Sequence, residues 1–448
     1  MRNGKGNEVT TTNSIEEIVK EPLAILGGPK AVPDGDQHED LFHWPVVTEE
    51  DERAVVEVLR AGTMSGLDVT RQFEDEFAEY QGVRYALGHP NGTMALLAAI
   101  YAAGLRRGDE LICPSVTFWA CAVPAFSLGA TVVFADIHPE SLCIDPGDIE
   151  RHVSRRTKAI MAVHYCGHPA DMEPVMAVAR KHRLKVIEDV SHAHGALYRS
   201  RMVGTFGDVS AMSMMAGKSL AIGEAGMLVT DDREIHERTI AFCHYERIAA
   251  EVEAPDLAAM AMGPNVGPLP LGGAKGRLNQ VCSAMGRVQL KHYPQRMAEI
   301  QRAMNRFWDL LNGTPGIRPH RPPEDSASTM GGWYNPVGHY LPEHLDGLPV
   351  ARFVEAVRAE GGRSRRGINF PLHLHPLFND ADVYGDGKPT RTAFSDRDLR
   401  QPPGSLPVAE GAAERTFGIP WFKHDRPGLI ERYAAAYRKV ALQADKLL

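Results

Sequence analysis

The stretch VIEDVSHAHGA, residues 186–196, begins as an apolar run and ends in polar side chains. The run stops at two adjacent acids, Glu188 and Asp189, and the histidines His192 and His194 follow closely. In α/β proteins, ligands bind beyond the carboxyl ends of parallel strands, which is where Asp189 stands. An ordinary buried strand has no use for a carboxylate at this end, so we expect a ligand next to Asp189.

Short apolar runs alternate with helical patterns on both sides of this stretch, from about residue 83 to residue 230. The alternation predicts an α/β fold with a mostly parallel central sheet and helices on both faces. Helices are expected between several of the strands, for example over 93–103 and 172–182. The expected strands are 84–88, 110–113, 131–135, 159–164, 185–189, 209–213 and 226–230.

The length of 448 residues favours more than one domain. A capping-box pattern from Thr48 to Asp51 predicts the start of a helix. We expect a loosely held N-terminal arm (1–45), a large cofactor-binding domain (46–290) and a smaller C-terminal α/β domain (291–448). We also expect a surface loop over 249–276, a long helix over 279–312 that is interrupted near Pro294, and a final helix over 425–448.

Composition and charge are those of an ordinary cytoplasmic protein. The formal net charge is −8, and no apolar run approaches the roughly 20 residues that cross a bilayer. These features disfavour nucleic acid and membranes as partners, and the polar N-terminus lacks the apolar core of a signal peptide. The six cysteines are widely spaced and form no CxxC pair, so we expect free thiols in a reducing compartment and no metal site.

Two further stretches predict an anion site and a reactive amine. NGTMAL (91–96) follows a strand and opens a helix, where Gly92 and Thr93 offer backbone N–H groups and a hydroxyl to a phosphate. SMMAGKSLAIGEAG (213–226) places Lys218 in a loop after a buried strand, where lost hydration lowers the lysine pKa and favours the neutral amine that forms a Schiff base. Taken alone, the first stretch equally fits a common turn and the second a solvated loop lysine.

An aromatic residue and the carboxylate complete the pattern. CPSVTFWACA (113–122) places Phe118 after a strand end, where it can stack on a planar cofactor, although an aromatic there more often belongs to the core. Asp189 would pair with the protonated ring nitrogen of pyridoxal 5′-phosphate (PLP), and His192 would lie near its phenolic oxygen or the substrate. Because all four stretches occur together on one strand–helix chain, we predict PLP as the cofactor.

The chain resembles the DegT/DnrJ/StrS family of sugar aminotransferases, which have the fold-type-I architecture of PLP-dependent enzymes. The resemblance runs from about Trp44 to the C-terminus. Besides the stretches quoted above, its carriers are SGLDVTRQFEDEFAEY (65–80), VVFADIHPESLCID (132–145), AVHYCGHPADM (162–172), GTFGD (204–208), GRLNQVCSAMGRVQL (276–290), PLHLHP (371–376) and LPVAEGAAERTFGIPWF (406–422).

The resemblance implies roles for individual residues. Lys218 would bond covalently to the cofactor, Asp189 would face the ring nitrogen, and His192 would lie beside the phenolic oxygen. The remaining implied cofactor contacts are Gly92, Thr93, Met94, Phe118 and Ser213.

The resemblance also implies a homodimer with its active sites at the interface. Family members have an Asn-Tyr-Arg-Met segment that reaches the partner's phosphate. Here residues 275–278 read Lys-Gly-Arg-Leu, so Lys275 replaces the asparagine. A lysine can still meet a phosphate as a point charge, and we include Lys275 among the expected cofactor contacts.

The implied reaction moves an amino group from glutamine or glutamate, through pyridoxamine phosphate, to a ketone. The stretch LAILGGPKAVPDGD (23–36) resembles the leader of members that act on keto-cyclitols and of aminohydroxybenzoate synthases. We therefore expect a keto-cyclitol or keto-sugar acceptor in secondary-metabolite biosynthesis of the aminoglycoside type, with His373 and His375 in the substrate site. The alternatives are a nucleotide-linked keto-sugar and a reaction like that of aminohydroxybenzoate synthases.

Four other classes of protein are alternatives to this interpretation. A PLP-binding sensor would bind the cofactor without a half-reaction with an amino donor. A metal hydrolase built on HAH (192–194) and HLH (373–375) lacks an acidic ligand at suitable spacing. Retention of Lys218 disfavours the related dehydratases, which have histidine there, and no GxGxxG follows a strand to bind a nicotinamide cofactor.

Overall fold

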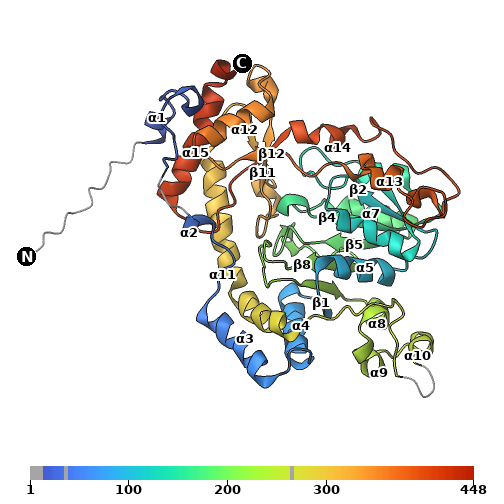
Figure 1. Ribbon diagram of the computed structural model, residues 1–448. Helices are drawn as coiled ribbons and strands as arrows, with labels where there is room; N and C mark the ends of the chain where they lie inside the picture. The colour runs from blue at the N-terminus through green and yellow to red at the C-terminus, as the bar shows by residue number, and fades with distance from the viewer. Residues whose placement is uncertain (1–13, 35–38, 263–266) are drawn as a thin grey trace, which may run out of the picture.

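The computed structural model describes residues 14–34, 39–262 and 267–448, and the structural statements below concern these residues. A seven-stranded sheet with the order β1-β9-β8-β5-β4-β2-β3 forms the centre of the larger part of the molecule (Figure 1). The strands are β1 Tyr85–His89, β2 Glu110–Pro114, β3 Thr131–Ala135, β4 Thr157–Val163, β5 Lys185–Asp189, β8 Val209–Ser213 and β9 Gly226–Thr230.

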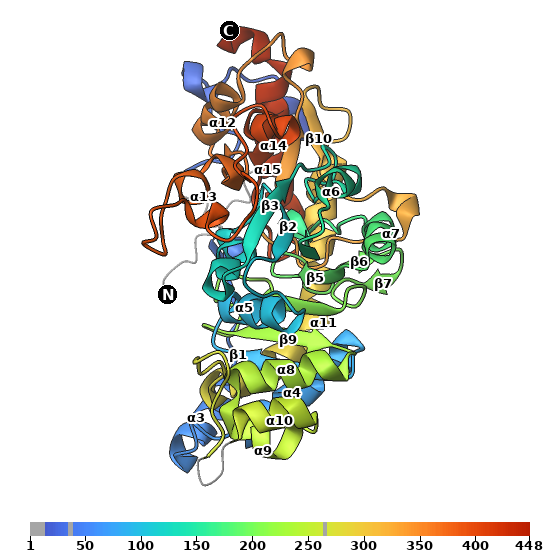
Figure 2. The same cartoon turned by 90° about the vertical axis from the view of Figure 1, so that its right-hand side faces the viewer.

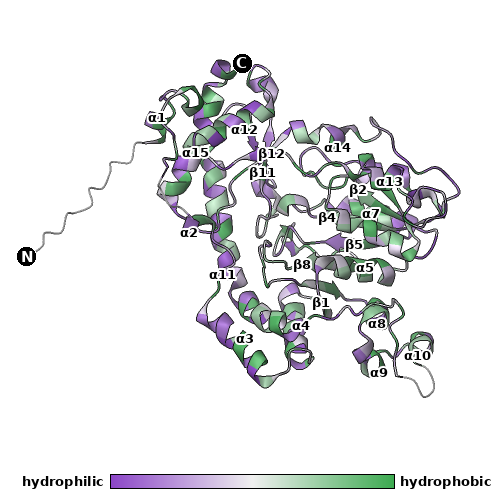
Figure 3. Cartoon of the chain, viewed as in Figure 1, coloured by the Kyte–Doolittle hydropathy of each residue, from purple (hydrophilic) through white to green (hydrophobic). Residues whose placement is uncertain are grey.

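The pairing of the strands confirms the predicted, mostly parallel sheet. The pairs β2–β3, β2–β4, β4–β5 and β5–β8 are parallel, whereas β9 runs antiparallel to both β1 and β8. All seven expected strands are present, and their ends lie within two residues of the predicted ones. Strands β2, β3 and β9 are buried at every residue, which explains why they read as continuous apolar runs (Figure 3).

Helices cover both faces of this sheet. Figure 2 shows α5 (Gly92–Ala102) on one side of the strands, and α6 (Pro146–His152) and α7 (Met172–His182) on the other. On the α5 side, α8 (Arg233–Cys243) packs against α5. A two-stranded hairpin, β6 (Leu197–Tyr198) with β7 (Arg201–Met202), projects beyond β5. The layers therefore leave the carboxyl ends of β4, β5 and β8 as the place where a site can form.

A long helix, α11 (Gln280–Leu310), connects the two parts of the molecule (Figure 1). It packs against α3 (Glu49–Ala61) and α4 (Asp68–Gln81) and against the C-terminal α15 (Pro427–Leu442). The helix continues through Pro294, so the predicted interruption is wrong. Packing of both halves, together with the Tyr293 hydroxyl that donates to the His194 carbonyl at 2.8 Å, holds the helix together across the proline.

The C-terminal part has its own sheet and core, as expected for a smaller α/β unit. The antiparallel order is β10-β11-β13-β12, from β10 (Ile317–Pro319), β11 (Val337–Tyr340), β13 (Thr416–Gly418) and β12 (Arg365–Arg366). Helices α12 (Val350–Ala359) and α15 pack on it around Trp308, Phe353 and Phe417. Within 372–412, however, buried residues join the core of the large sheet, and Arg391 donates to the Val132 carbonyl at 2.7 Å. The domain boundaries themselves stay a prediction.

The described part of the N-terminal arm is held firmly on the C-terminal unit, which differs from the expected loose arm. Leu23 and Val32 are buried in the core of that unit. Glu360, paired with Lys439 at 2.8 Å, accepts hydrogen bonds from the backbone of Ala24 and Ala31. The two short helices of the N-terminal region are α1 (Ile15–Ile18) and α2 (Glu39–Phe42), and residues 1–13 and 35–38 of the predicted arm lie outside the described residues.

Three smaller expectations have clear outcomes. The capping box formed by Thr48 and Asp51 is present at the start of α3, and the six cysteines are free thiols. The segment 249–276 is not entirely loop, because it includes most of α9 (Ile248–Glu251) and all of α10 (Pro255–Ala261); residues 263–266 lie outside the description. These helices form because Ile248 packs with Leu87 in a small separate core. No helix in the described ranges is long and apolar enough to cross a membrane.

Candidate active site

A pocket of about 330 Å³ lies at the carboxyl ends of the central strands. It brings together segments that are far apart in the sequence, from the start of α5 to Asn369, just after β12. Seven of the predicted site residues line it: Gly92, Thr93, Phe118, Asp189, His192, Ser213 and Lys218. The other lining residues include Thr117, Trp119, Ser191, Met215, Glu224, Tyr334, Asn335 and Asn369.

The N-terminus of α5 forms a cradle for an anion. Asn91 caps the helix, because its side-chain oxygen accepts a hydrogen bond from the Met94 backbone at 2.8 Å. A Cβ atom on Gly92 would lie 2.6 Å from the Cβ of Ser213, so only glycine allows the helix to approach the end of β8 this closely. Backbone N–H groups at a helix start, with hydroxyls nearby, are the groups that bind phosphate. Met94 itself does not line the pocket.

Asp189 lies at the floor of the pocket and is 4% exposed. Its Oδ1 accepts a hydrogen bond from the Ser191 backbone at 2.9 Å, and its Oδ2 accepts one from the Cys121 thiol at 3.0 Å. Neither donor carries a charge. A buried carboxylate is expensive without a positive partner, so the site favours a ligand with a cationic group at this position.

Lys218 reaches the pocket from the loop between β8 and β9 and is 7% exposed. Burial lowers the pKa of Lys218 from 10.5 to about 8, and the charge of Asp189 opposes this shift. The loop is fixed by Trp44, whose indole N–H donates to the Lys218 carbonyl at 2.9 Å. A substantial share of the side chain is therefore a neutral amine near pH 8, the form that attacks a carbonyl carbon.

His192 and two aromatic residues surround the remaining space. His192 is buried, its Nδ1 accepts a hydrogen bond from the Cys166 backbone at 3.3 Å, and burial keeps its pKa well below the usual value. The ring is therefore neutral. Phe118 and Trp119 lie at the mouth, 47% and 45% exposed, with ring centroids 5.0 Å apart. The stacking role of Phe118 stays a prediction.

Four predicted contacts do not line this pocket. The amine of Lys275 lies 5.9 Å from the centroid of the Tyr245 ring. His373 is buried between the Ser115 hydroxyl at 2.6 Å and Glu410 at 3.0 Å. His375 caps α13 (Pro376–Asn379), since its Nδ1 accepts a hydrogen bond from the Leu377 backbone. The roles predicted for Met94, Lys275, His373 and His375 remain predictions.

Sequence reasoning missed several residues that shape the site. Cys121 and Ser191 hold Asp189, whereas Trp44 and Tyr334 contact Lys218. Trp44 and Tyr334 come from segments more than one hundred residues away from Lys218, so no local spacing reveals them. Cys121 and Ser191, in contrast, stand within the stretches 113–122 and 186–196. Because a buried carboxylate needs hydrogen-bond donors, both residues could have been predicted as partners of Asp189.

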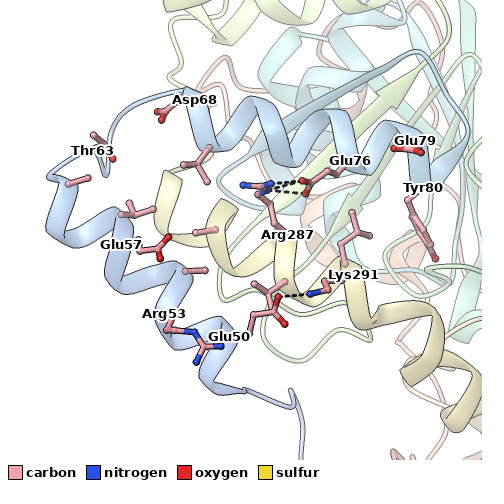
Figure 4. A pocket seen from close by; sticks show the side chains of 17 residues that line it. Glu50, Arg53, Glu57, Thr63, Asp68, Glu76, Glu79, Tyr80, Arg287 and Lys291 are labelled. Carbon is pink, nitrogen blue, oxygen red and sulfur yellow. Dashed lines mark hydrogen bonds and ion pairs between the residues drawn. The ribbon is translucent and has the colours of Figure 1, made fainter.

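A larger groove of about 900 Å³ lies elsewhere, between α3, α4 and the first half of α11 (Figure 4). Two ion pairs lie in it: Arg287 with Glu76 and Lys291 with Glu50, each at 2.7 Å. These pairs are partly exposed, and the groove offers no buried amine beside a buried carboxylate among its described lining residues. Size alone is therefore misleading, and the chemistry points to the smaller pocket that holds Lys218.

The fold and the pocket together define the class of protein. Three features of the pocket fit the three reactive parts of PLP. The amine of Lys218, with its lowered pKa, suits the aldehyde, and the carboxylate of Asp189, whose hydrogen-bond donors are uncharged, suits the ring nitrogen. The start of α5, which approaches β8 closely because residue 92 is glycine, suits the phosphate. These are the features of a PLP-dependent enzyme of fold type I.

Comparison with known proteins gives the family. The chain belongs to the DegT/DnrJ/EryC1/StrS aminotransferase family, whose model matches residues 45–424. It is 32% identical over 350 residues to the L-glutamine:2-deoxy-scyllo-inosose aminotransferase of Streptomyces kanamyceticus, covering 75% of this chain and 79% of that protein. It is 42% identical over 172 residues to the GDP-perosamine synthase of Escherichia coli O157:H7, covering 38% of this chain and 47% of that protein.

A solved structure agrees with the family assignment. The aminotransferase from Psychrobacter cryohalolentis aligns with a TM-score of 0.77 at 28% identity, covering 90% of this chain and 99% of that chain. The predicted family, fold class and cofactor are confirmed. The chain is a PLP-dependent aminotransferase whose relatives act on sugars and cyclitols.

Proposed function

We propose that this enzyme transfers an amino group from glutamine or glutamate to a keto-cyclitol or an unattached keto-sugar, in secondary-metabolite biosynthesis of the aminoglycoside type. One observation carries the choice of acceptor. Among the described residues that line the pocket there is no arginine, and Lys218 is the single lysine. A phosphorylated or nucleotide-linked acceptor would need cations beside its phosphates, whereas a neutral polyol needs none.

The other lining groups suit a hydroxylated ring. Asn335 and Asn369 present side-chain amides to the pocket, and the exposed rings of Phe118 and Trp119 offer flat surfaces at the mouth. Amides hydrogen-bond hydroxyls as donors and acceptors, and aromatic faces pack on the apolar faces of sugars. Arg365 contacts Asn335, donating to its side-chain oxygen at 2.5 Å, but does not line the pocket.

The proposed roles follow from the positions of the side chains. When bound, PLP supplies an electron sink that stabilises negative charge on the substrate carbon. Asp189 holds a proton on the ring nitrogen through its charge. Lys218 would hold the cofactor between turnovers, and its free amine would carry a proton between the α-carbon of the amino donor and the C4′ carbon of the cofactor. His192, which lines the pocket, would orient the ring through its phenolic oxygen.

A nucleotide-linked acceptor is the second candidate, and the partial similarity to a GDP-perosamine synthase favours it. Such an acceptor would place its phosphates outside the described pocket, against a second subunit.

We propose that the enzyme is a homodimer in which Lys275 of one subunit approaches the phosphate of the other. Free thiols at all six cysteines support a reducing, cytoplasmic location.

The experiment starts from the pyridoxamine form, prepared with glutamine or glutamate and freed from the donor. Keto-cyclitols, keto-sugar phosphates and nucleotide-linked keto-sugars are then added one at a time, and the return of the aldehyde-form absorbance is measured. We expect keto-cyclitols or free keto-sugars to restore it. Restoration by nucleotide-linked sugars alone would overturn the proposed acceptor, and failure of both donors to convert the cofactor would indicate a binding protein without turnover.

A further inference from the structure

A cluster of three buried side chains lies apart from the Lys218 pocket, below the start of α5. His89 ends β1, Cys243 ends α8, and His244 follows directly after that helix. All three are fully buried, and one ligand-type atom from each lies within 4.8 Å of the other two. The two imidazole rings meet edge to face, with centroids 4.9 Å apart. None of these residues lines the active-site pocket.

The histidines of this cluster have no hydrogen-bond partners. All four ring nitrogens of His89 and His244 are buried and unpartnered. The backbone of Gly276 interacts with His89, although not within full hydrogen-bond geometry, and its N–H donates to the Cys243 carbonyl at 2.8 Å. The Cys243 thiol has a long contact of 3.6 Å to the Thr239 carbonyl. A buried polar group without a partner is destabilising, so this arrangement favours a ligand that takes one nitrogen from each ring together with the thiol.

The surrounding charges leave room for a cation. The nearby Arg247 is paired with Glu74 at 2.7 Å and 2.9 Å, and both side chains are buried. Glu246, two residues beyond His244, is paired with Arg277 at 2.8 Å. The two arginines nearest the cluster are thus each balanced by a carboxylate, which weakens their repulsion of a metal ion.

We propose that His89, Cys243 and His244 bind a zinc ion. Two imidazole nitrogens and one thiolate form a ligand set that suits a borderline-soft divalent ion, and a water molecule can supply the fourth position. Tetrahedral zinc brings its ligand atoms to roughly 3.5 Å from one another, so the side chains must close by about 1 Å. Cys243 binds as the thiolate, so each ion that enters releases one proton to solvent. This site departs from the expectation, drawn from the sequence, that the chain binds no metal.

The position of the site gives it a structural role. His89 stands two residues before Asn91, which caps α5 and so shapes the phosphate cradle. Cys243 holds Gly276 through its carbonyl, and a Cβ atom on Gly276 would lie 2.6 Å from the Cys243 sulfur. Figures 1 and 2 both place α8 near β1. Zinc would therefore tie β1, α8 and the segment 275–278 together beneath the cofactor cradle.

The test measures the metal content of the purified holoenzyme after dialysis against a weak chelator. We expect about one zinc per chain in the wild type, and a loss of at least roughly tenfold in Cys243→Ser and His89→Gln. Cys143→Ser is the matched control, because it removes another buried thiol, which donates to the carbonyls of Ser141 and His168. The control should keep its zinc.

Cobalt provides a second readout that does not depend on the variants folding. Replacing zinc by Co²⁺ in the wild type should give visible d–d bands at longer wavelength than the cofactor absorbs, with the intensity of a tetrahedral thiolate site. A strong chelator should lower the melting temperature of the wild type and leave that of Cys243→Ser unchanged. A wild type that binds neither zinc nor cobalt, or Cys243→Ser and His89→Gln variants that bind as much zinc as the control, would overturn the proposal. Aminotransferase activity plays no part in these readouts.

Discussion

The amine of Lys218 lies 3.7 Å from the centroid of the Tyr334 ring, which comes from the loop before β11 in the C-terminal part of the chain. The same Tyr334 ring lies 4.6 Å from that of His192. An aromatic face and the charge of Asp189 both favour a charged lysine, yet burial outweighs them and the pKa falls to about 8. The C-terminal unit thus completes the site, and Lys218 is poised between its charged and neutral forms.

This balance predicts how the stability of the cofactor-free protein depends on pH. The pKa of Lys218 is 10.5 in an ordinary setting and about 8 in the folded protein, so the unfolded chain binds more protons between these values. Below pH 8 the buried positive charge of Lys218 lowers the free energy of unfolding, and this loss should be recovered as the pH rises toward 10.5. Relative to Lys218→Met, the wild type should gain roughly 2–3 kcal/mol between pH 7 and pH 10, as measured by denaturant unfolding. Stability curves for the two proteins that stay parallel over this range would contradict the assigned pKa.

The close approach of α5 to β8 predicts the effect of Gly92→Ala. The added methyl group would meet the Cβ of Ser213 at 2.6 Å, so the start of the helix must shift away from the phosphate. We expect the affinity for PLP to fall by roughly 1–3 kcal/mol, or about 5- to 150-fold, as measured by equilibrium titration of the cofactor-free enzyme. Gly411→Ala is the control, because a Cβ atom at Gly411 meets nothing within 4 Å. Equal affinities for the two variants would show that the cradle does not depend on Gly92.

The environment of Asp189 predicts two different outcomes. Asp189→Asn removes the negative charge that keeps the ring nitrogen protonated, and kcat should fall by roughly 100-fold or more. In the wild type the Cys121 thiol donates to the Asp189 carboxylate at 3.0 Å. A serine at this position can donate in its place, so kcat of Cys121→Ser should stay within about tenfold of the wild type. Steady-state kinetics with a saturating donor measure both. A larger loss in Cys121→Ser than in Asp189→Asn would refute the role given to the carboxylate.

The buried pair of Glu360 and Lys439 predicts a stability effect far from the site. Both side chains are almost fully buried, and Lys439 also donates to the Pro29 carbonyl at 2.7 Å. Lys439→Met leaves Glu360 without its cation and should lower the free energy of unfolding by about 3–5 kcal/mol. Glu343→Gln, which breaks a pair between the exposed side chains of Glu343 and Arg415, should change the free energy of unfolding far less, because water screens an exposed pair. Comparable losses in the two variants would contradict this ranking.

The sequence predicts well those features that local chemistry determines. The seven strands are recognisable because burial of most of their residues gives short, largely apolar runs that alternate with helical patterns. Asp189 is recognisable because a carboxylate at a strand end needs a partner. Lys218 and Gly92 stand in short motifs whose backbone context predicts their role. The structure places all three in one pocket.

Features that depend on distant contacts are not visible in the same way. Tyr334 and Trp44 meet Lys218 only because the C-terminal unit and the N-terminal region fold onto the large sheet. His89 and Cys243 are 154 residues apart, so no metal-ligand spacing could bring them to notice. Pro294 would end an isolated helix, but contacts along both halves of α11 override that local preference.

The central claim is that Lys218 is the amine that holds PLP, opposite Asp189. The most direct measurement is borohydride reduction of the purified holoenzyme, followed by protease digestion and mass spectrometry of the peptides. We predict one pyridoxyl group per chain, on the peptide that contains Lys218, and none in Lys218→Ala. A pyridoxyl group on another lysine, such as Lys275 or the buried Lys423, or no group on any peptide, would contradict the account.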